Sequence, residues 1–374
     1  MSRDRLFILT EDSILELDKH VVIIGGGIFG LTAAIVLGEK GFKVTVLEKG
    51  NDVMQEASMV NQNRIHYGYH YPRSRATCEE SLAGLTSFSA FYGKTINNSF
   101  KKYYAIAKNN SHINAQQFVE FAASLNLPLN ESWPEDGILN KDLLEACWLT
   151  PEPIFDYDAL KQIVLYRIAA CKNIQVLRNA KPISLKETGS SKEITLTNYH
   201  KINCDIIINA TYSGLSDVLS TFDREPINAK YQLCVMPILE MQNPSSPFGV
   251  TIMDGPFCSL MPKGFQKGTF ILYHVVHSVI EQHVGKKNID WTPINGMVEM
   301  DIMEKSTPYY PIIKNMKLIG SWITTRIVLP QQEIDDARPT LLMDNGNYIY
   351  SIFSGKLTTC VDAANQITDL ISKL

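Results

Sequence analysis

The sequence has few cysteines, and they form no recognisable pattern. The 374-residue chain contains 7 of them, and no two have the CxxC spacing. Zinc and iron–sulfur ligation therefore have no support, and the odd number argues against a disulfide framework. We predict reduced thiols, no metal site and a cytoplasmic location.

The chain also lacks a strong net charge and a membrane segment. Its 35 basic and 39 acidic residues give a net charge of −4, so we expect neither nucleic acid nor an anionic membrane as a partner. Residues 21–37 are almost wholly apolar, but three consecutive glycines interrupt them, and a membrane helix needs roughly 20 residues. The acidic residues 11–18 before them are wrong for a signal peptide. We predict a soluble protein without a membrane span.

No internal repeat and no low-complexity linker divides the chain, which is long enough for two packed domains with large cores. Apolar periodicity predicts helices over residues 79–91, 116–125, 158–170 and 357–374. The same approach predicts strands over residues 102–107, 174–177, 194–196, 206–208, 231–241, 269–277 and 348–353.

Residues 21–49 carry the most informative pattern: an apolar strand, a glycine turn, an apolar helix and a second strand that ends in an acid. The glycines match GxGxxG, in which they allow a tight turn, close approach to a pyrophosphate and close packing of the helix on the strand. The helix N-terminus offers free N–H groups to phosphate oxygens, and the acid can accept hydrogen bonds from a ribose. A turn without a ligand is the alternative. We predict a dinucleotide site formed by Gly25, Gly27, Ile28, Phe29, Gly30, Glu48 and Lys49.

Six further segments follow this motif at intervals along the chain. They are Ala57-Ser58, the stretch from Ile65 to Pro72 (IHYGYHYP), the stretch from Thr150 to Asp156 (TPEPIFD), the stretch from Asp205 to Thr211 (DIIINAT), the stretch from Asp335 to Pro339 (DDARP) and Ser354-Gly355-Lys356. Together with the glycine motif they resemble the D-amino-acid oxidase superfamily of FAD-dependent oxidoreductases, which includes glycine oxidase, sarcosine oxidase and L-2-hydroxyglutarate oxidase. The resemblance covers most of the chain. It departs from the family pattern at Tyr212, where the family has a glycine, and at Ser354-Gly355-Lys356, where it has a double-glycine stretch.

The resemblance implies an α/β fold. We expect a Rossmann-like FAD-binding domain of the glutathione-reductase type 2, interleaved with an α+β substrate domain built on an antiparallel sheet. The FAD domain is expected to take residues 1–90, 147–228 and 315–374, and the substrate domain residues 91–146 and 229–314. FAD is the implied cofactor, with further contacts expected from Ala57, Ser58, Asn63, Arg64, Ile65, His66, Ala210, Thr211, Gly355, Lys356 and Leu357.

The implied reaction is dehydrogenation of a small 2-hydroxy acid or amino acid at the carbon that bears the hydroxyl or amine, with hydride passing to the flavin. Arg338 is the candidate for binding a substrate carboxylate, because a guanidinium can bind one with two hydrogen bonds; an ion pair with Asp335 or Asp336 is the alternative. His66 is the candidate for a general base or a hydrogen-bond partner to the substrate heteroatom, and a structural histidine is the alternative. Tyr71, together with Tyr67 and Arg73, is expected to line the pocket, or else to belong to a loop that packs against the sheet.

Two more absences bear on the reaction. GxGxxG occurs once, so we expect no separate NAD(P)H domain, and electrons should come from the substrate and leave to oxygen or another acceptor. The chain has no Gly-Asp dipeptide, which aromatic-ring hydroxylases of the related flavin fold carry, and this argues against a monooxygenase. Two alternatives stay open: an NAD(P)-dependent dehydrogenase that uses the same glycine motif, and a flavin-binding scaffold without catalysis.

Overall fold

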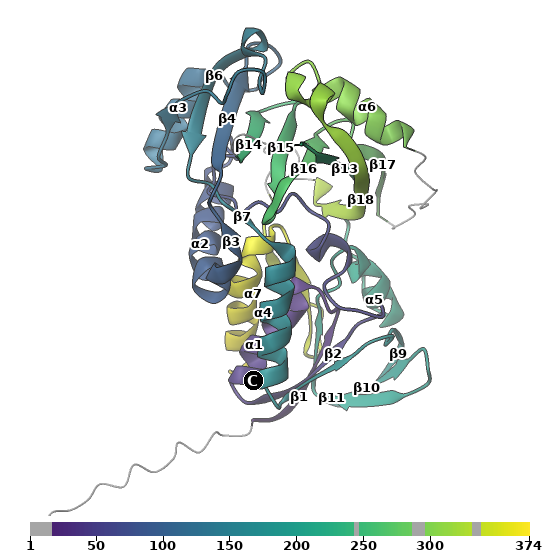
Figure 1. Cartoon of the computed structure of the whole chain (residues 1–374). Coiled ribbons are helices and arrows are strands. Elements are labelled where there is room, and N and C mark those ends of the chain that lie inside the picture. Colours follow the sequence, from purple (N-terminus) through teal and green to yellow (C-terminus); the bar gives the residue numbers. More distant parts are fainter. Residues whose placement is uncertain (1–16, 243–246, 286–295, 331–337) are drawn as a thin grey trace, which may run out of the picture.

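The computed structural model describes residues 17–242, 247–285, 296–330 and 338–374. Figure 1 shows a lower part built around a parallel sheet and an upper part built around a larger, mainly antiparallel sheet. Residues 1–16 of the expected FAD domain, and residues 335–337 of the segment that precedes Arg338, lie outside the described residues.

The lower part contains a six-stranded sheet with the order β19-β20-β12-β1-β2-β8. All neighbouring strands are parallel except β19 and β20, which are antiparallel. The strands are β1 (Leu17–Ile24), β2 (Phe42–Leu47), β8 (Ile174–Leu177), β12 (Ile206–Asn209), β19 (Leu341–Asp344) and β20 (Ile349–Phe353). Residues 21–24 of β1 and residues 206–208 of β12 are apolar on both faces, as expected for a parallel sheet that is covered on both sides.

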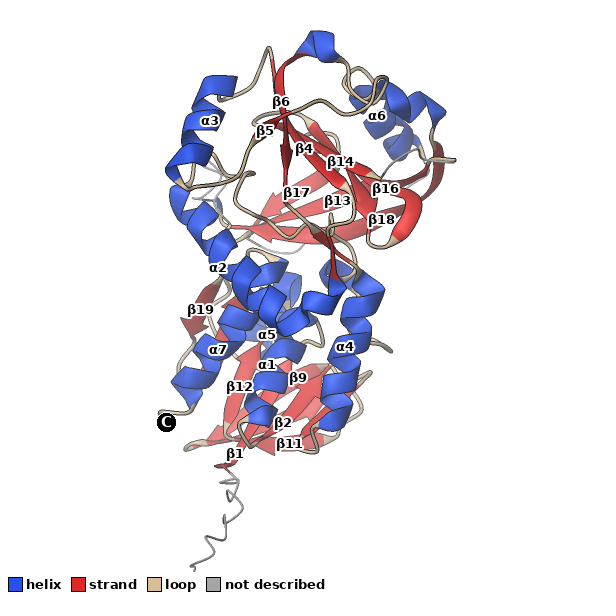
Figure 2. Ribbon diagram, turned by 60° about the vertical axis from the view of Figure 1, so that its left-hand side comes forward, coloured by secondary structure: helices blue, strands red, loops and turns tan. Residues whose placement is uncertain are grey.

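Alternate residues of these strands face two different layers. Val21 and Ile23 belong to one core with the helices α1 (Ile28–Glu39), α4 (Tyr157–Ala170) and α7 (Cys360–Ile371). Val22 and Ile24 belong to another core, beneath a small sheet of β9 (Pro182–Thr188), β10 (Ser191–Leu196) and β11 (Lys201–Cys204). Side chains alternate across a strand, so one apolar strand supplies both cores. Figure 2 shows the helices in front of the parallel strands.

The upper part contains a nine-stranded sheet, in which β14 and β4 are parallel and the other pairs are antiparallel. Its strands are β4 (Lys101–Ala107), β5 (Asn130–Glu131), β6 (Leu144–Thr150), β13 (Lys230–Glu240), β14 (Phe248–Met253), β15 (Cys258–Lys263), β16 (Gln266–His274), β17 (Val279–Val284) and β18 (Lys317–Val328). Helices α3 (Ala115–Ser124) and α6 (Met297–Ser306) pack on it through separate apolar clusters.

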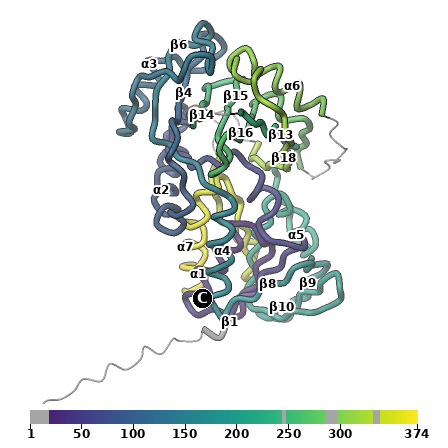
Figure 3. Tube along the Cα trace, in the orientation of Figure 1, coloured from purple at the N-terminus to yellow at the C-terminus, as the bar shows by residue number. Residues whose placement is uncertain are grey.

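The chain passes between the two parts several times. Helix α2 (Arg75–Tyr92) runs downward, from Cys78 in an apolar cluster of the upper part to Phe88 and Tyr92 in the helix core of the lower part. A short ladder of β3 (Ile96–Asn97) and β7 (Ile154–Phe155) then joins the segment that leads up to β4 and the segment that returns from β6. Helix α5 (Leu215–Thr221) follows β12. Figure 3 shows the C-terminal segment in yellow beside the N-terminal helix in purple, and α7 packs against α1. The two parts are therefore interleaved in sequence, as expected.

The predicted helices and strands are found with shifts of a few residues at their ends. The last helix differs, because residues Leu357–Thr359 form a 3-10 turn and the α-helix begins at Cys360. The expected domain boundaries at 147 and 315 also differ from the sheet membership. Strand β6 pairs with β4 as far as Thr150, and β18 pairs with β13 along almost its whole length. Both strands thus belong to the upper sheet; the rest of the expected division stays a prediction.

None of the helices in residues 17–242, 247–285, 296–330 and 338–374 is both long enough and apolar enough to cross a bilayer.

Candidate active site

A cavity of about 1220 Å³ lies where the two parts meet. From below it is lined by the carboxyl ends of parallel strands, including Gly25 after β1 and Glu48 after β2. From above it is lined by side chains of the nine-stranded sheet, including Met236, Tyr273 and Arg326. Ligand sites of α/β sheets lie at this end of the strands. The volume exceeds the roughly 300–1,000 Å³ of ordinary small-molecule sites, which leaves room for a dinucleotide together with a substrate.

The glycine turn after β1 has a geometry that larger residues would disrupt. Gly25 has a φ of +107°, and a side chain there would meet the Ala210 carbonyl oxygen at 2.7 Å. Gly27 precedes the first turn of α1 and has no capping side chain. Gly30 does not line the cavity; an added Cβ would lie 2.0 Å from the Gly25 carbonyl oxygen, so this glycine lets the helix pack on the turn.

Two side chains complete this turn. Glu48 accepts hydrogen bonds from the Gly26 N–H at 2.8 Å and the Gly50 N–H at 2.7 Å, so backbone amides hold its carboxylate at the tip of β2. Ser58 lies in a short 3-10 turn, Glu56–Ser58, and its Oγ accepts a hydrogen bond from the Ile28 N–H at 3.0 Å. The positive end of α1 and the oriented carboxylate therefore line one cavity. This arrangement fits the pyrophosphate and ribose of a dinucleotide.

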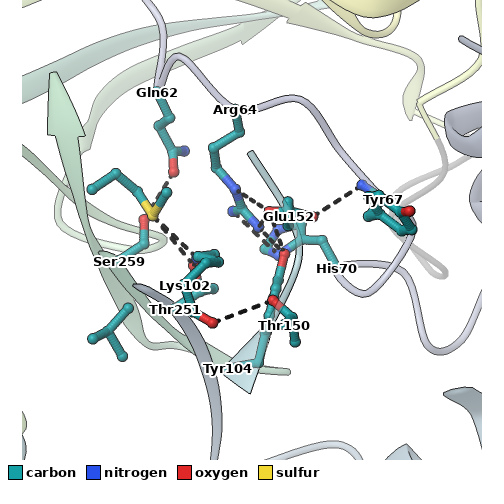
Figure 4. Close-up of polar contacts among 12 residues, drawn as sticks. Gln62, Arg64, Tyr67, His70, Lys102, Tyr104, Thr150, Glu152, Thr251 and Ser259 are labelled. Atoms are coloured by element: carbon teal, nitrogen blue, oxygen red, sulfur yellow. Dashed lines mark hydrogen bonds and ion pairs between the residues drawn. The ribbon is translucent and has the colours of Figure 1, made fainter. Parts of the chain in front are cut away.

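A buried ion pair supports the loop that carries the candidate base (Figure 4). Arg64 Nη2 lies 3.1 Å from Glu152 Oε1, with 2% and 0% of the two side chains exposed. The Tyr104 hydroxyl donates to Glu152 Oε1 at 2.7 Å, and the Tyr67 N–H donates to Glu152 Oε2 at 3.0 Å. Burial raises the pKa of Glu152, but Arg64, Lys102 and these donors outweigh it and hold the pKa below its ordinary value. Glu152 therefore stays ionised and fixes the loop.

His66 lies between the two residues that Glu152 holds. Its ring centroid is 5.6 Å from that of His70 and 5.4 Å from that of Tyr71, and all three residues line the cavity. Burial, with the charges of Arg64, Lys356 and Lys102, lowers the pKa of His66 well below its ordinary value. Its Nδ1 is buried and has no hydrogen-bond partner among the described residues. A neutral imidazole with an unused ring nitrogen can accept a proton or a hydrogen bond.

The C-terminal segment brings a second group of predicted residues to the cavity. Lys356 is buried, and its Nζ lies 3.0 Å from Glu80 Oε2 and 5.1 Å from the Tyr71 ring centroid. Burial lowers the pKa of Lys356, although Glu80 opposes the shift. A side chain at Gly355 would come within 1.9 Å of the Arg338 carbonyl oxygen, so the two segments cross closely. The alternative ion pair of Arg338 with Asp335 or Asp336 lies outside the described residues.

Most of the predicted residues therefore share one cavity. Four do not line it: Gly30, Asn63, Ile65 and Tyr67. Asn63 is buried and donates from Nδ2 to the Phe155 carbonyl oxygen at 3.2 Å. Ile65 belongs to the core that β1 forms with α1, α4 and α7. The residues that do line it are Gly25, Gly27, Ile28, Phe29, Glu48, Lys49, Ala57, Ser58, Arg64, His66, Tyr71, Arg73, Ala210, Thr211, Arg338, Gly355, Lys356 and Leu357.

Sequence reasoning missed other polar residues of the cavity. Arg326 on β18 donates from Nε and Nη2 to Gln232 Oε1, at 2.9 and 2.7 Å, and from Nη1 to the Tyr273 hydroxyl at 2.9 Å. Arg73, by contrast, was expected to line the pocket; it does so, and its Nε lies 2.5 Å from Asp254 Oδ2. The only signal for Arg326 was an arginine within an otherwise uncharged stretch, and nothing in the sequence brought it next to Gln232.

The family model of FAD-dependent oxidoreductases (DAO) matches residues 20–326. The chain belongs to this family. Among its relatives, the FAD-dependent monooxygenase FPY4 of Fusarium mangiferae is 25% identical over 358 residues, which cover 93% of this chain and 90% of FPY4. Glycine oxidase from Geobacillus kaustophilus has a similar fold, with a TM-score of 0.76 at 12% identity and coverage of 95% of both chains. L-alpha-glycerophosphate oxidase from Mycoplasma pneumoniae, with FAD bound, gives a TM-score of 0.76 at 14% identity, covering 95% of this chain and 94% of that one.

Membership of this FAD-dependent oxidoreductase family answers several of the open questions. The cofactor is FAD, as predicted, and the protein is an oxidoreductase rather than a scaffold. The alternative of an NAD(P)-dependent dehydrogenase is not supported. The argument against a monooxygenase from the missing Gly-Asp dipeptide finds no support either, since FPY4 is named as one.

Proposed function

We propose that this oxidoreductase dehydrogenates a small 2-hydroxy acid or amino acid at the carbon that bears the hydroxyl or amine. The observation that carries the proposal is the neutral His66, whose buried Nδ1 has no partner among the described residues and which shares one cavity with Arg338 and the glycine turn. The seven cysteines are free, which supports a cytoplasmic location as part of the same proposal.

The lower half of the cavity would hold the cofactor. Gly25 and Gly27 line the cavity without a side chain, so the backbone of the turn could approach the cofactor closely. The first turn of α1 would contact the pyrophosphate, and Glu48 would accept hydrogen bonds from a ribose. Bound FAD supplies the two-electron acceptor that the protein's own side chains lack. Lys356, which Glu80 holds at 3.0 Å, would line this half of the cavity at the C-terminal segment.

The other half would bind the substrate. Arg338 would hold a carboxylate through its guanidinium, which matches that group with two parallel hydrogen bonds. His66 would accept the proton of the substrate hydroxyl or amine, because burial and neighbouring cations keep its imidazole neutral. Glu152 holds this histidine indirectly: it binds the Arg64 side chain on one side of His66 and the Tyr67 N–H on the other.

The direct test is the absorption spectrum of the FAD-loaded protein, recorded without oxygen before and after adding 2-hydroxy acids and amino acids one at a time. Bleaching of the flavin by one class supports the proposal and identifies the substrate class. Return of the colour on admitting air would identify oxygen as an acceptor, whereas recovery only with an added dye would indicate another one. A flavin that no member of either class bleaches would contradict the proposal.

The name of FPY4 favours a second candidate, a flavin monooxygenase. Such an enzyme requires an external reductant, and the chain carries GxGxxG only once. The same spectral experiment distinguishes the dehydrogenase from the monooxygenase if NADH or NADPH is added in place of the 2-hydroxy acid or amino acid. Bleaching by a nicotinamide nucleotide, with oxygen consumption that depends on an aromatic or other neutral substrate, would favour the monooxygenase.

A further inference from the structure

Most cations that line the cavity are already neutralised by a carboxylate of the protein. Arg64 is paired with Glu152 at 3.1 Å, Arg73 with Asp254 at 2.5 Å and Lys356 with Glu80 at 3.0 Å. Each of these pairs leaves little net charge for a ligand. They can shape the cavity without attracting an anion strongly.

Arg326 is different, because its partners are neutral. Three of its N–H groups donate to the Gln232 side-chain oxygen and the Tyr273 hydroxyl, and no carboxylate of the described residues pairs with it. The surrounding protein disfavours the charge, yet Tyr273, Cys234 and Tyr212 act in the other direction and keep the pKa of Arg326 above its ordinary value. The guanidinium therefore stays charged in a low-dielectric site. A charge so placed is costly unless an anion accompanies it.

The geometry of Arg326 leaves donors for such an anion. A guanidinium has five N–H groups, and the contacts to Gln232 and Tyr273 use one on each nitrogen. One N–H of Nη1 and one of Nη2 have no partner among the described residues. Because Nε and Nη2 both donate to Gln232, the remaining N–H of Nη2 points away from Gln232, and together with the remaining N–H of Nη1 it can donate to a carboxylate or a phosphate. Gln232 and Tyr273 meanwhile hold the fork in one orientation.

Arg326 also lies close to the residue assigned to the substrate carboxylate. Tyr212 and Tyr273 both line the cavity, and the charges of both Arg326 and Arg338 act on the hydroxyl of each tyrosine. Burial raises the pKa of both hydroxyls, and the two guanidiniums oppose that shift. Two arginines from separate segments therefore face one region of the cavity.

We propose that Arg326 is a second anion-binding residue, so that the substrate carries two negative charges, one held by Arg338 and one by Arg326. The inference rests on the proposed function and narrows its substrate class to dicarboxylates or to acids that also carry a phosphate. Gln232 and Tyr273 act as positioning residues, and they determine that the fork faces the cavity.

The sharpest test is Gln232→Glu in the FAD-loaded protein. This change keeps the shape of the side chain and the acceptor oxygen but gives Arg326 a counterion within the protein. The attraction between Arg326 and a ligand anion should therefore be weaker. Gln282→Glu is the matched control. Gln282 is exposed, its side-chain oxygen accepts a hydrogen bond from Gln232 Nε2 at 3.2 Å, and the residue makes no hydrogen bond to Arg326. Affinities are measured from the shift of the flavin absorption spectrum on titration with malonate, succinate and glutarate, with propionate, butyrate and valerate as monocarboxylates of equal length, and with inorganic phosphate.

A hydrogen-bonded charge pair is worth about 1.5–3 kcal/mol, which corresponds to roughly a tenfold to hundredfold change in affinity. We expect at least one dicarboxylate, or phosphate, to bind about tenfold or more tightly than the monocarboxylates. We expect Gln232→Glu to remove that advantage while monocarboxylate binding stays within about twofold. A larger effect on phosphate than on the dicarboxylates would identify the second group as a phosphate, and the reverse as a carboxylate.

Three results would overturn the proposal: no advantage of a dianion in the unaltered protein, an advantage that survives Gln232→Glu, or equal losses for mono- and dianions. If Gln232→Glu does not fold, Arg326→Gln provides the same comparison. The assay measures binding and needs no turnover, so its result is independent of whether the protein oxidises a 2-hydroxy acid or an amino acid. A flavin that substrates bleach, but whose anion affinity ignores Gln232→Glu, would leave the reaction standing and remove only the second anion site.

Discussion

Glu152→Gln removes the charge of a fully buried carboxylate with almost no change in shape. Glu152 accepts from Arg64 Nε at 3.3 Å and Nη2 at 3.1 Å, from the Tyr104 hydroxyl at 2.7 Å and from the Tyr67 N–H at 3.0 Å. Glutamine replaces one of these acceptor oxygens with an NH2 group, which then faces a donor. Arg64 also loses its counterion while 2% of its side chain is exposed. Removing one partner of a buried ion pair costs about 3–5 kcal/mol.

The measurement is the free energy of unfolding in urea for the unaltered protein and the variant. The matched control is Glu193→Gln, which breaks an exposed pair with Lys201 at 2.8 Å and should change the free energy of unfolding by no more than about 0.5 kcal/mol. We expect Glu152→Gln to lower the free energy of unfolding several times more than Glu193→Gln does. Equal losses in the two variants would refute the reasoning that burial makes the Glu152 pair important.

The pH dependence gives a second check on the same variant. The folded-state pKa of Glu152 lies below its ordinary value, so its contribution to stability is present above the unfolded pKa of about 4.3 and is lost as pH falls through the lower folded value. The stability gap between the unaltered protein and Glu152→Gln should therefore be largest near neutral pH and narrow in acid. A gap that widens on acidification would contradict the assigned ionisation.

Three further predictions concern the cavity. Gly25→Ala should weaken FAD binding about tenfold or more, because the backbone has a φ of +107° and the new Cβ would meet the Ala210 carbonyl oxygen at 2.7 Å. The control is Gly93→Ala, whose new Cβ meets nothing within 4 Å, and flavin fluorescence measures FAD binding in both variants. His66→Asn should lower kcat by about 10²–10⁴ with FAD still bound, and kcat/KM of the unaltered enzyme should not fall as pH drops through about 6.5, because the lowered pKa keeps His66 neutral. A loss of kcat/KM at that pH that follows His66 would contradict this. Arg338→Lys should raise KM about tenfold or more with little change in kcat, since lysine cannot make two parallel hydrogen bonds to a carboxylate, and unchanged KM would remove Arg338 from substrate binding.

The sequence alone was sufficient for the dinucleotide half of the molecule, because the signals there are local. The spacing of Gly25, Gly27 and Gly30 reflects the steric needs of one turn, and those needs appear in the structure as the close approaches to Ala210 and Gly25. Glu48 follows β2 directly, so its position at the strand tip depends on a few neighbouring residues. The helices and strands that the sequence did predict, such as residues 158–170 and 231–241, were found for the same reason, since periodicity reports which face of an element is buried.

The substrate half depended on contacts between distant segments. Glu152 was part of a recognised segment but had no predicted role, because its function comes from Arg64, Tyr67 and Tyr104, which are 48 to 88 positions away. The assignment of β6 and β18 to the upper sheet likewise depended on pairing partners that no local pattern announces.

Arg326 shows most clearly which properties the sequence determined and which depended on the tertiary structure. The sequence determined only that this residue carries a permanent positive charge within an otherwise uncharged stretch. Only the tertiary structure decided that the charge faces the cavity, with Gln232 and Tyr273 as its partners and without a carboxylate among the described residues. The physical reason is that a chain determines its own turns and periodicities locally, whereas the electrostatic environment of a side chain is the sum over neighbours that folding brings together from separate parts of the sequence.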